Sequence, residues 1–138
     1  MESLKKIARK IPTWVASALC LAAILWLTLS PEPVGAADLP LFPGADKLVH
    51  AVLFGGFTLT LCFDFAKWRG GKRFISGLYL CIAVIISSAT GILREILQRA
   101  MSLGRSFEIA DIFADISGAI IATVIIAIYL RYYNSSSH

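Results

Sequence analysis

The chain has 138 residues, of which 57% are hydrophobic and 16% are charged, and its formal net charge is +4. A chain of this length forms one compact domain at most, and a soluble domain of this size cannot hide so much apolar surface from water. The composition therefore predicts a single membrane domain over 1–138. No cluster of base-contacting residues indicates a nucleic-acid partner. The three cysteines lie inside apolar runs without metal-ligand spacing, so we interpret them as packing residues.

Four apolar segments predict an all-α membrane protein with four transmembrane helices, over about 12–30, 46–66, 73–98 and 110–132. A helix needs roughly 20 apolar residues to cross the hydrocarbon of a bilayer. The second segment is the weakest, because Asp64 shortens it and His50 lies near its start. The first segment has a second interpretation as a signal peptide, since small residues at 34–37 resemble a cleavage site. Its apolar stretch is long for that role, so we expect the helix to be retained.

The basic residues predict the orientation of these helices. Lys and Arg precede the first segment and fill the turn between the second and third, whereas the stretch 31–46 contains neither. The positive-inside rule then places both termini in the cytoplasm. Arg99 and Arg105 weaken this bias without reversing it. We expect a multi-pass protein of the plasma (inner) membrane.

This topology gathers polar residues from separate stretches near the outer membrane face. The residues concerned are Asp46, Lys47, His50, Arg94, Glu95, Gln98, Arg105, Glu108, Asp111 and Asp115. Asp46 and His50 are four residues apart and share a helix face. Asp111 and Asp115 have the same spacing, and Gly118 continues their face. Small residues allow a neighbouring helix to come close, so we expect both aspartates to point into the bundle.

Charged residues at this depth have both a functional and a structural interpretation. An Asp at mid-bilayer costs about 3 kcal/mol, and pairing with Lys47, Arg94 or Arg105 would offset that cost. Ionisable residues inside a membrane are functional candidates for this reason. Asp46 and Asp111 also suit helix N-termini through capping and the helix dipole. A purely structural cluster therefore stays open.

Five short motifs occur in a characteristic order. They are Leu27-Thr28-Leu29-Ser30-Pro31, Asp46-Lys47-Leu48-Val49-His50, Gly91-Ile92-Leu93-Arg94-Glu95-Ile96-Leu97-Gln98, Gly104-Arg105-Ser106-Phe107 and Asp111-Ile112-Phe113-Ala114-Asp115-Ile116-Ser117-Gly118-Ala119. Together they resemble the VanZ-like family of small membrane proteins over most of the chain. Each motif alone is weak, and the ordered set is fairly specific.

Two positions depart from the pattern that this resemblance implies. Asp115 stands where asparagine is usual, and Arg94 stands where an apolar residue is common. The two extra charges have opposite signs. We therefore predict that Arg94 and Asp115 form a compensating pair.

The resemblance implies a place in the cell envelope and attaches no reaction to it. The namesake of the family is associated with low-level resistance to the glycopeptide teicoplanin, without the altered peptidoglycan precursors of the usual route. A link to glycopeptide resistance is therefore an expectation that comes from the resemblance alone.

Our first functional hypothesis is binding of an anionic lipid or a lipid-linked envelope precursor. Paired guanidinium groups suit phosphate geometry, and nearby carboxylates would orient the cations. The candidate ligand-binding residues are Asp46, Lys47, Arg94, Gln98, Arg105, Asp111 and Asp115.

The alternative hypothesis is an intramembrane enzyme that acts on a lipid-linked substrate. His50, oriented by Asp46, would be the general base, and Glu95 would be the acid. No Ser or Cys nucleophile motif accompanies them. A metal held by His50, Glu95, Asp111 and Asp115 has suitable donor atoms, but the predicted helices contain only one histidine, so we expect no metal and no cofactor.

A transporter is a third hypothesis, although four helices are few for a complete pathway and no inverted repeat is visible. The sequence indicates no particular oligomeric state.

Overall fold

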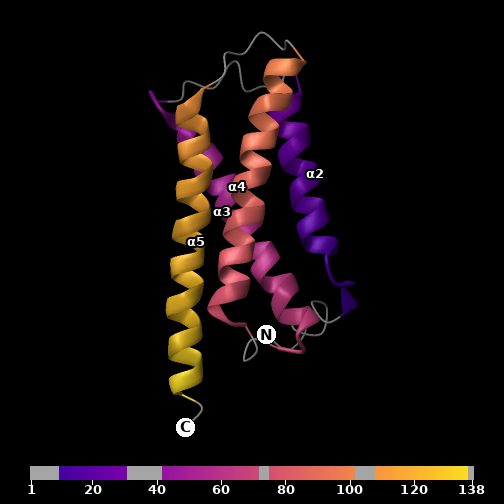
Figure 1. Ribbon diagram of the computed structural model, residues 1–138, viewed down its shortest axis with the longest axis vertical. Coiled ribbons are helices and arrows are strands. Elements are labelled where there is room, and N and C mark those ends of the chain that lie inside the picture. Colours follow the sequence, from indigo (N-terminus) through magenta and orange to yellow (C-terminus); the bar gives the residue numbers. More distant parts are fainter. Residues whose placement is uncertain (1–9, 31–41, 72–74, 102–107, 137–138) are drawn as a thin grey trace.

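The computed structural model describes residues 10–30, 42–71, 75–101 and 108–136. They form four helices, which are α2 (Val15–Leu29), α3 (Ala45–Trp68), α4 (Gly77–Ala100) and α5 (Ile109–Ser135). Successive helices run in opposite directions, so α2 and α4 end where α3 and α5 begin (Figure 1). We call this end of the bundle the polar end and the opposite end the aromatic end. The predicted all-helical fold with four helices is confirmed.

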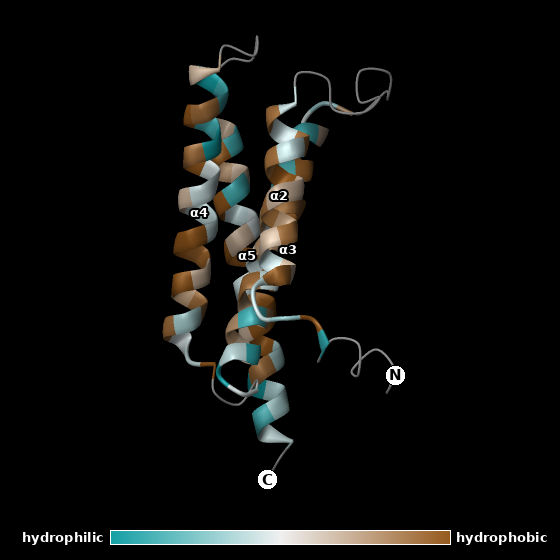
Figure 2. Cartoon of the chain, turned by 90° about the vertical axis from the view of Figure 1, so that its right-hand side faces the viewer, coloured by the Kyte–Doolittle hydropathy of each residue, from teal (hydrophilic) through white to brown (hydrophobic). Residues whose placement is uncertain are grey.

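Three of the four helices are long and apolar enough to cross a membrane, namely α3, α4 and α5. A helix of 24 residues, the length of α3 and α4, extends about 36 Å and exceeds the ~30 Å of bilayer hydrocarbon. Apolar residues cover most of the length of these helices (Figure 2). Helix α2 has 15 residues, which extend about 22 Å. It begins three residues later than predicted, after Trp14, whose φ of 75° lies outside the helical region.

Helices α3 and α5 form the closest contact in the bundle, and glycine makes this contact possible. A Cβ atom added to Gly118 of α5 would lie 2.0 Å from the carbonyl oxygen of Ala51 in α3. A Cβ atom added to Gly55 would lie 3.2 Å from the carbonyl oxygen of Gly118. The two backbones therefore pack directly against each other, as small residues permit between membrane helices. This crossing lies beside His50 and Asp115 in the sequence.

Two polar contacts hold α2 at its ends. At the aromatic end, Oδ2 of the buried Asp64 accepts hydrogen bonds from the Ser17 amide at 3.1 Å and from the Ser17 hydroxyl at 2.5 Å. At the polar end, Nε2 of Gln98 donates to the carbonyl oxygen of Thr28 at 2.5 Å. The first amides and last carbonyls of a helix lack partners within it. Asp64 and Gln98 therefore act as caps for α2, although they belong to other helices.

A group of aromatic rings covers the aromatic end. Trp14 packs edge-on against Phe65, with ring centroids 5.2 Å apart, and Phe65 lies 5.4 Å from Tyr79. Trp68 contacts Trp14 and Tyr79, and the Arg69 guanidinium lies 5.8 Å from the centre of the Tyr79 ring. Rings of Trp and Tyr are enriched where a membrane meets water. The group therefore connects α3, α4 and the residue that precedes α2.

Candidate functional site

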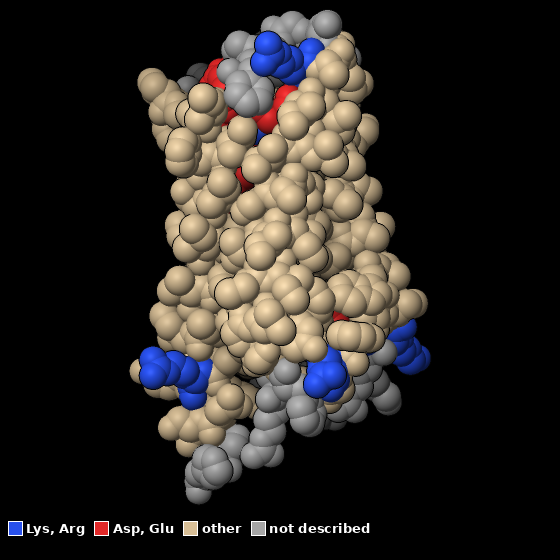
Figure 3. Space-filling view, in the orientation of Figure 1, with Lys and Arg blue, Asp and Glu red and all other residues tan. Residues whose placement is uncertain are grey.

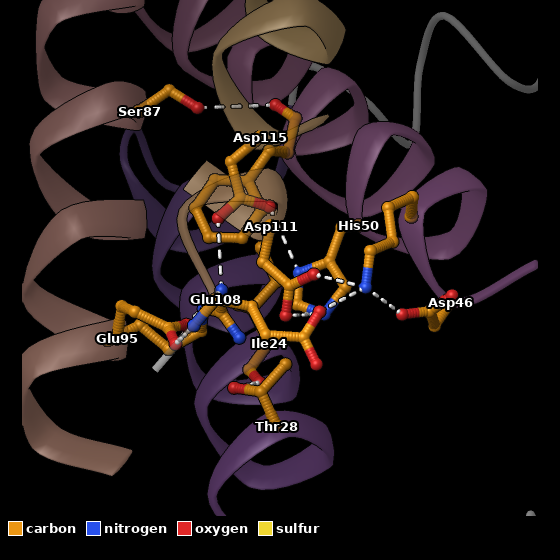
Figure 4. A network of polar contacts seen from close by, with 12 residues as sticks. Ile24, Thr28, Asp46, His50, Ser87, Glu95, Glu108, Asp111 and Asp115 are labelled. Carbon is orange, nitrogen blue, oxygen red and sulfur yellow. Dashed lines mark hydrogen bonds and ion pairs between the residues drawn. The ribbon is translucent and has the colours of Figure 1, made fainter. Parts of the chain in front are cut away.

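Charged side chains gather near the two ends of the molecule, and the broad band between them is largely uncharged (Figure 3). At the polar end, three helices and the residue before α5 contribute to one connected set of side chains (Figure 4). We call this set the polar cluster. Its members are Asp46, Lys47, His50, Arg94, Glu95, Gln98, Glu108, Asp111 and Asp115. The structure brings together in this cluster every site residue predicted from the sequence except Arg105, which lies outside the described residues.

Arg94 is the centre of the buried layer of this cluster. Its Nη2 lies 3.2 Å from Oδ2 of Asp115 and 3.0 Å from Oε2 of Glu95, and its Nη1 donates to Oε1 of Gln98 at 3.3 Å. The predicted pair between Arg94 and Asp115 is confirmed. Gly91, one turn earlier on α4, leaves room for Asp115, because a Cβ atom there would lie 2.7 Å from Oδ2 of Asp115. Both terminal nitrogens of the Arg94 guanidinium are therefore engaged in contacts within the bundle.

His50 joins the buried layer from α3. Its Nδ1 lies 3.0 Å from Oδ1 of Asp115, and its Nε2 lies 3.7 Å from Oδ2 of Asp111. The expectation that Asp46 orients His50 is wrong, since Asp46 turns outward to Lys47. The i, i+4 spacing placed both residues on one helix face, but the close crossing of α3 and α5 brings α5 carboxylates nearer to the ring. Asp115 therefore takes the orienting position.

An outer rim surrounds this buried layer, and it consists of Lys47, Asp46, Glu108 and Asp111. Nζ of Lys47 lies 2.5 Å from Asp46 Oδ2, 2.5 Å from Glu108 Oε2 and 3.0 Å from Asp111 Oδ1. Carboxylate oxygens of Asp46, Glu108 and Asp111 lie within 4.8 Å of one another, which is a spacing that suits a cation. The lysine ammonium is the positive charge among them. Asp46 and Glu108 are exposed, so the rim opens to the surroundings of the bundle.

Glu95 connects the buried layer to the rim. Its Oε2 accepts from Arg94, and its Oε1 accepts the backbone amide of Glu108 at 2.8 Å. The Glu108 amide immediately precedes α5, so Glu95 holds the start of that helix. Glu108 was absent from the binding set predicted from the sequence. Its position directly before α5 is the signal that identifies it, because acidic residues favour helix N-termini.

The described cluster contains more acid than base. Five carboxylates face two permanent cations, Lys47 and Arg94, so its net charge is −3 when His50 is neutral. Within the described ranges, Nε of Arg94 is also a buried donor without an acceptor. The arrangement can hold a positively charged group and can orient one imidazole for proton transfer.

No curated protein and no solved structure matches the chain. The family model described as VanZ/LLP1 matches residues 13–130, which is most of the 138-residue chain and includes the whole polar cluster. The resemblance that the ordered motifs predicted is confirmed. The chain therefore belongs to the VanZ/LLP1 family and is a VanZ-like membrane protein.

Proposed function

We propose that the chain crosses the plasma (inner) membrane four times, with both termini in the cytoplasm and the polar end outward. Helices α3, α4 and α5 supply three spans. The short α2 packs against α3 and α4, and the caps from Asp64 and Gln98 satisfy backbone groups at both of its ends. Basic residues at the aromatic end, such as Lys67 and Arg69, agree with a cytoplasmic location.

Reporter fusions test this orientation. A fluorescent protein that matures only in the cytoplasm, fused after residue 138, should fluoresce. An alkaline phosphatase, which is active only outside the inner membrane, should be inactive at the same site. The reverse pattern would contradict the proposed topology.

We also propose that the polar cluster binds the head group of a lipid or of a lipid-linked envelope precursor. The observation that carries this proposal is the half-exposed rim around Lys47, which lies over a buried layer that is already paired internally. In the proposed orientation the rim lies at the outer end of the spans, where lipid head groups are found. The rim side chains can exchange partners with such a ligand while Arg94 and Asp115 keep the helices in place.

The charges of the cluster indicate how such a head group would be held. Arg94 is buried and engaged, so an anionic phosphate would depend on Lys47 and on the predicted contribution of Arg105. The surrounding carboxylates would repel a ligand that carries only negative charge. An anionic group that also carries an amine, as a zwitterionic head group does, suits this mixed rim better.

Native mass spectrometry of the protein from nanodiscs of mixed phosphatidylethanolamine and phosphatidylglycerol tests the binding. Lys47→Gln should reduce the amount of retained lipid severalfold. Lys67→Gln is the matched control, because Lys67 lies on the same helix at the aromatic end. Equal retention by the two variants would refute binding at the rim.

An enzyme that acts on a lipid-linked substrate is a second candidate function. The contact of 3.0 Å between His50 and Asp115 favours it, because a carboxylate on one ring nitrogen orients the other for acid–base work. If the protein confers glycopeptide resistance, His50→Ala and Glu95→Gln should abolish teicoplanin protection at normal membrane abundance. Loss that follows falling abundance would instead indicate a structural role.

A further inference from the structure

Four side chains form the buried layer of the polar cluster, and their charges do not balance. Arg94 and Asp115 are 0% exposed, Glu95 is 1% exposed and His50 is 8% exposed. Arg94 is the permanent cation of this quartet, and it contacts both of its carboxylates. The quartet therefore has a charge of −1 when the imidazole is neutral.

An unbalanced charge in this place is unfavourable. A buried carboxylate needs a countercharge or enough hydrogen bonds to replace its hydration. The other permanent cation of the described cluster is Lys47, which the rim carboxylates of Asp46, Glu108 and Asp111 already surround. The quartet therefore lacks one positive charge of its own.

The surroundings of His50 show where that charge belongs. Two carboxylates from α5 face its ring nitrogens, with Asp115 at 3.0 Å from Nδ1 and Asp111 at 3.7 Å from Nε2. A neutral imidazole has one N–H donor, whereas the imidazolium has two. In the neutral form, one ring nitrogen would direct its lone pair toward a carboxylate oxygen. In the protonated form, both nitrogens direct an N–H toward a carboxylate.

The neighbours on the other helices do not replace this proton. On α3, Lys47 and Asp46 belong to the rim. On α4, Arg94 contacts Asp115 on the oxygen that His50 does not use, and Glu95 is paired with Arg94. The described part of α2 carries no charged side chain and contributes only the Thr28 carbonyl, which accepts from Gln98.

We propose that the quartet is a binding site for one exchangeable proton, held on His50 between Asp115 and Asp111 at neutral pH. The proton comes from water at the rim, and its loss leaves the quartet with a charge of −1. Because Nε2 lies on the side of Asp111, which belongs to the rim, the proton can pass between His50 and a group bound there. His50 thus acts as a proton donor in its resting state.

Nitrogen NMR of the full-length protein in nanodiscs tests this inference directly. The chain has two histidines, and His138 serves as an internal reference in the same spectrum. His50 should show two nitrogens of the protonated type at pH 7. Asp115→Asn removes one carboxylate from the quartet without changing the shape of the side chain. It should reduce the share of His50 that is protonated at pH 7, because the imidazolium then faces one carboxylate instead of two.

Two results decide the proposal, and neither requires the function of the protein to be known. A neutral imidazole in the wild-type protein at pH 7 would overturn it, since another group would then balance the quartet. An unchanged share of protonated His50 at pH 7 in Asp115→Asn would also overturn it. Asp46→Asn is the control, because Asp46 contacts Lys47, and this variant should leave the nitrogen signals of His50 at pH 7 unaltered. A far-ultraviolet circular dichroism spectrum that matches the wild type shows that each variant is folded.

Discussion

The two ends of the bundle stabilise buried carboxylates in different ways. At the aromatic end, the carboxylate of Asp64 is 1% exposed, and its hydrogen-bond partners among the described residues are the amide and the hydroxyl of Ser17 at the start of α2. At the polar end, five carboxylates, two permanent cations and a histidine form one connected set. A helix N-terminus can stabilise a buried acid without any cation. The simple arrangement at Asp64 shows what packing alone requires, and the polar end exceeds that requirement.

The largest effect should come from the glycine crossing that positions the polar end. Gly118→Ala places a Cβ atom against the Ala51 carbonyl, so α3 and α5 must separate and His50 must leave Asp115. We expect a loss of about 3 kcal/mol or more in the free energy of unfolding, measured in mixed micelles. Gly56→Ala is the matched control, since a Cβ atom at Gly56 meets nothing within 4 Å. Similar stability of the two variants would show that the crossing is looser than described.

The next largest effect concerns the pair formed by Arg94 and Asp115. Arg94→Ile leaves two buried carboxylates without their cation and should cost about 3–5 kcal/mol. Asp115→Asn in the same chain should recover part of this loss, because it removes one of those carboxylates. A double-mutant cycle on unfolding free energies measures the coupling. Strictly additive losses would mean that the pair does not contribute as a unit.

A smaller effect is expected at the aromatic end. Asp64→Leu removes the acceptor of the Ser17 amide and should cost about 1–2 kcal/mol, as the loss of a helix cap does. Asp64→Asn keeps an acceptor oxygen and should cost less. Lipid retention at the polar end should be unchanged in both variants, when it is compared at equal amounts of folded protein. A drop in lipid retention would show that the two ends are coupled.

The smallest effect on stability should come from the rim. Asp46→Asn changes an exposed side chain, so thermal denaturation should match the wild type within error. Retention of an amine-bearing lipid should fall, because the rim loses one carboxylate beside Lys47. Reduced stability with unchanged lipid retention would mean that the rim stabilises the bundle and does not bind lipid, so that the two ends would not differ in role.

The sequence predicted the fold better than it predicted the partners within the cluster. The lengths of the apolar segments predicted the four helices. The pair of Arg94 with Asp115 was predicted because both positions differ from the family pattern by a charge, and the two charges have opposite signs. The partner of His50 did not follow, because spacing along α3 says nothing about how close α5 comes. Arg94 was nominated as a ligand contact, and the structure places it at the centre of the scaffold, since its burial depends on three helices at once.

Asp64 illustrates a second limit of prediction from sequence. The sequence predicts a second helix that ends near 66, with Asp64 shortening its apolar stretch, yet α3 continues to Trp68. The charge is tolerated because Ser17, which is 47 residues away, supplies both donors. An aspartate in an apolar run predicts that a partner exists. It does not identify the partner, which depends on tertiary contacts.

The order of the helices along the chain has a consequence for biogenesis. A ribosome delivers α2 before α3, so Ser17 reaches the membrane before Asp64, which needs it. It delivers α3 and α4 before α5, so His50 and Arg94 precede Asp115. Each of these two costly carboxylates therefore enters the bilayer when its partner has already been synthesised. During co-translational insertion, neither carboxylate therefore stays unpaired in the bilayer until a later helix is synthesised.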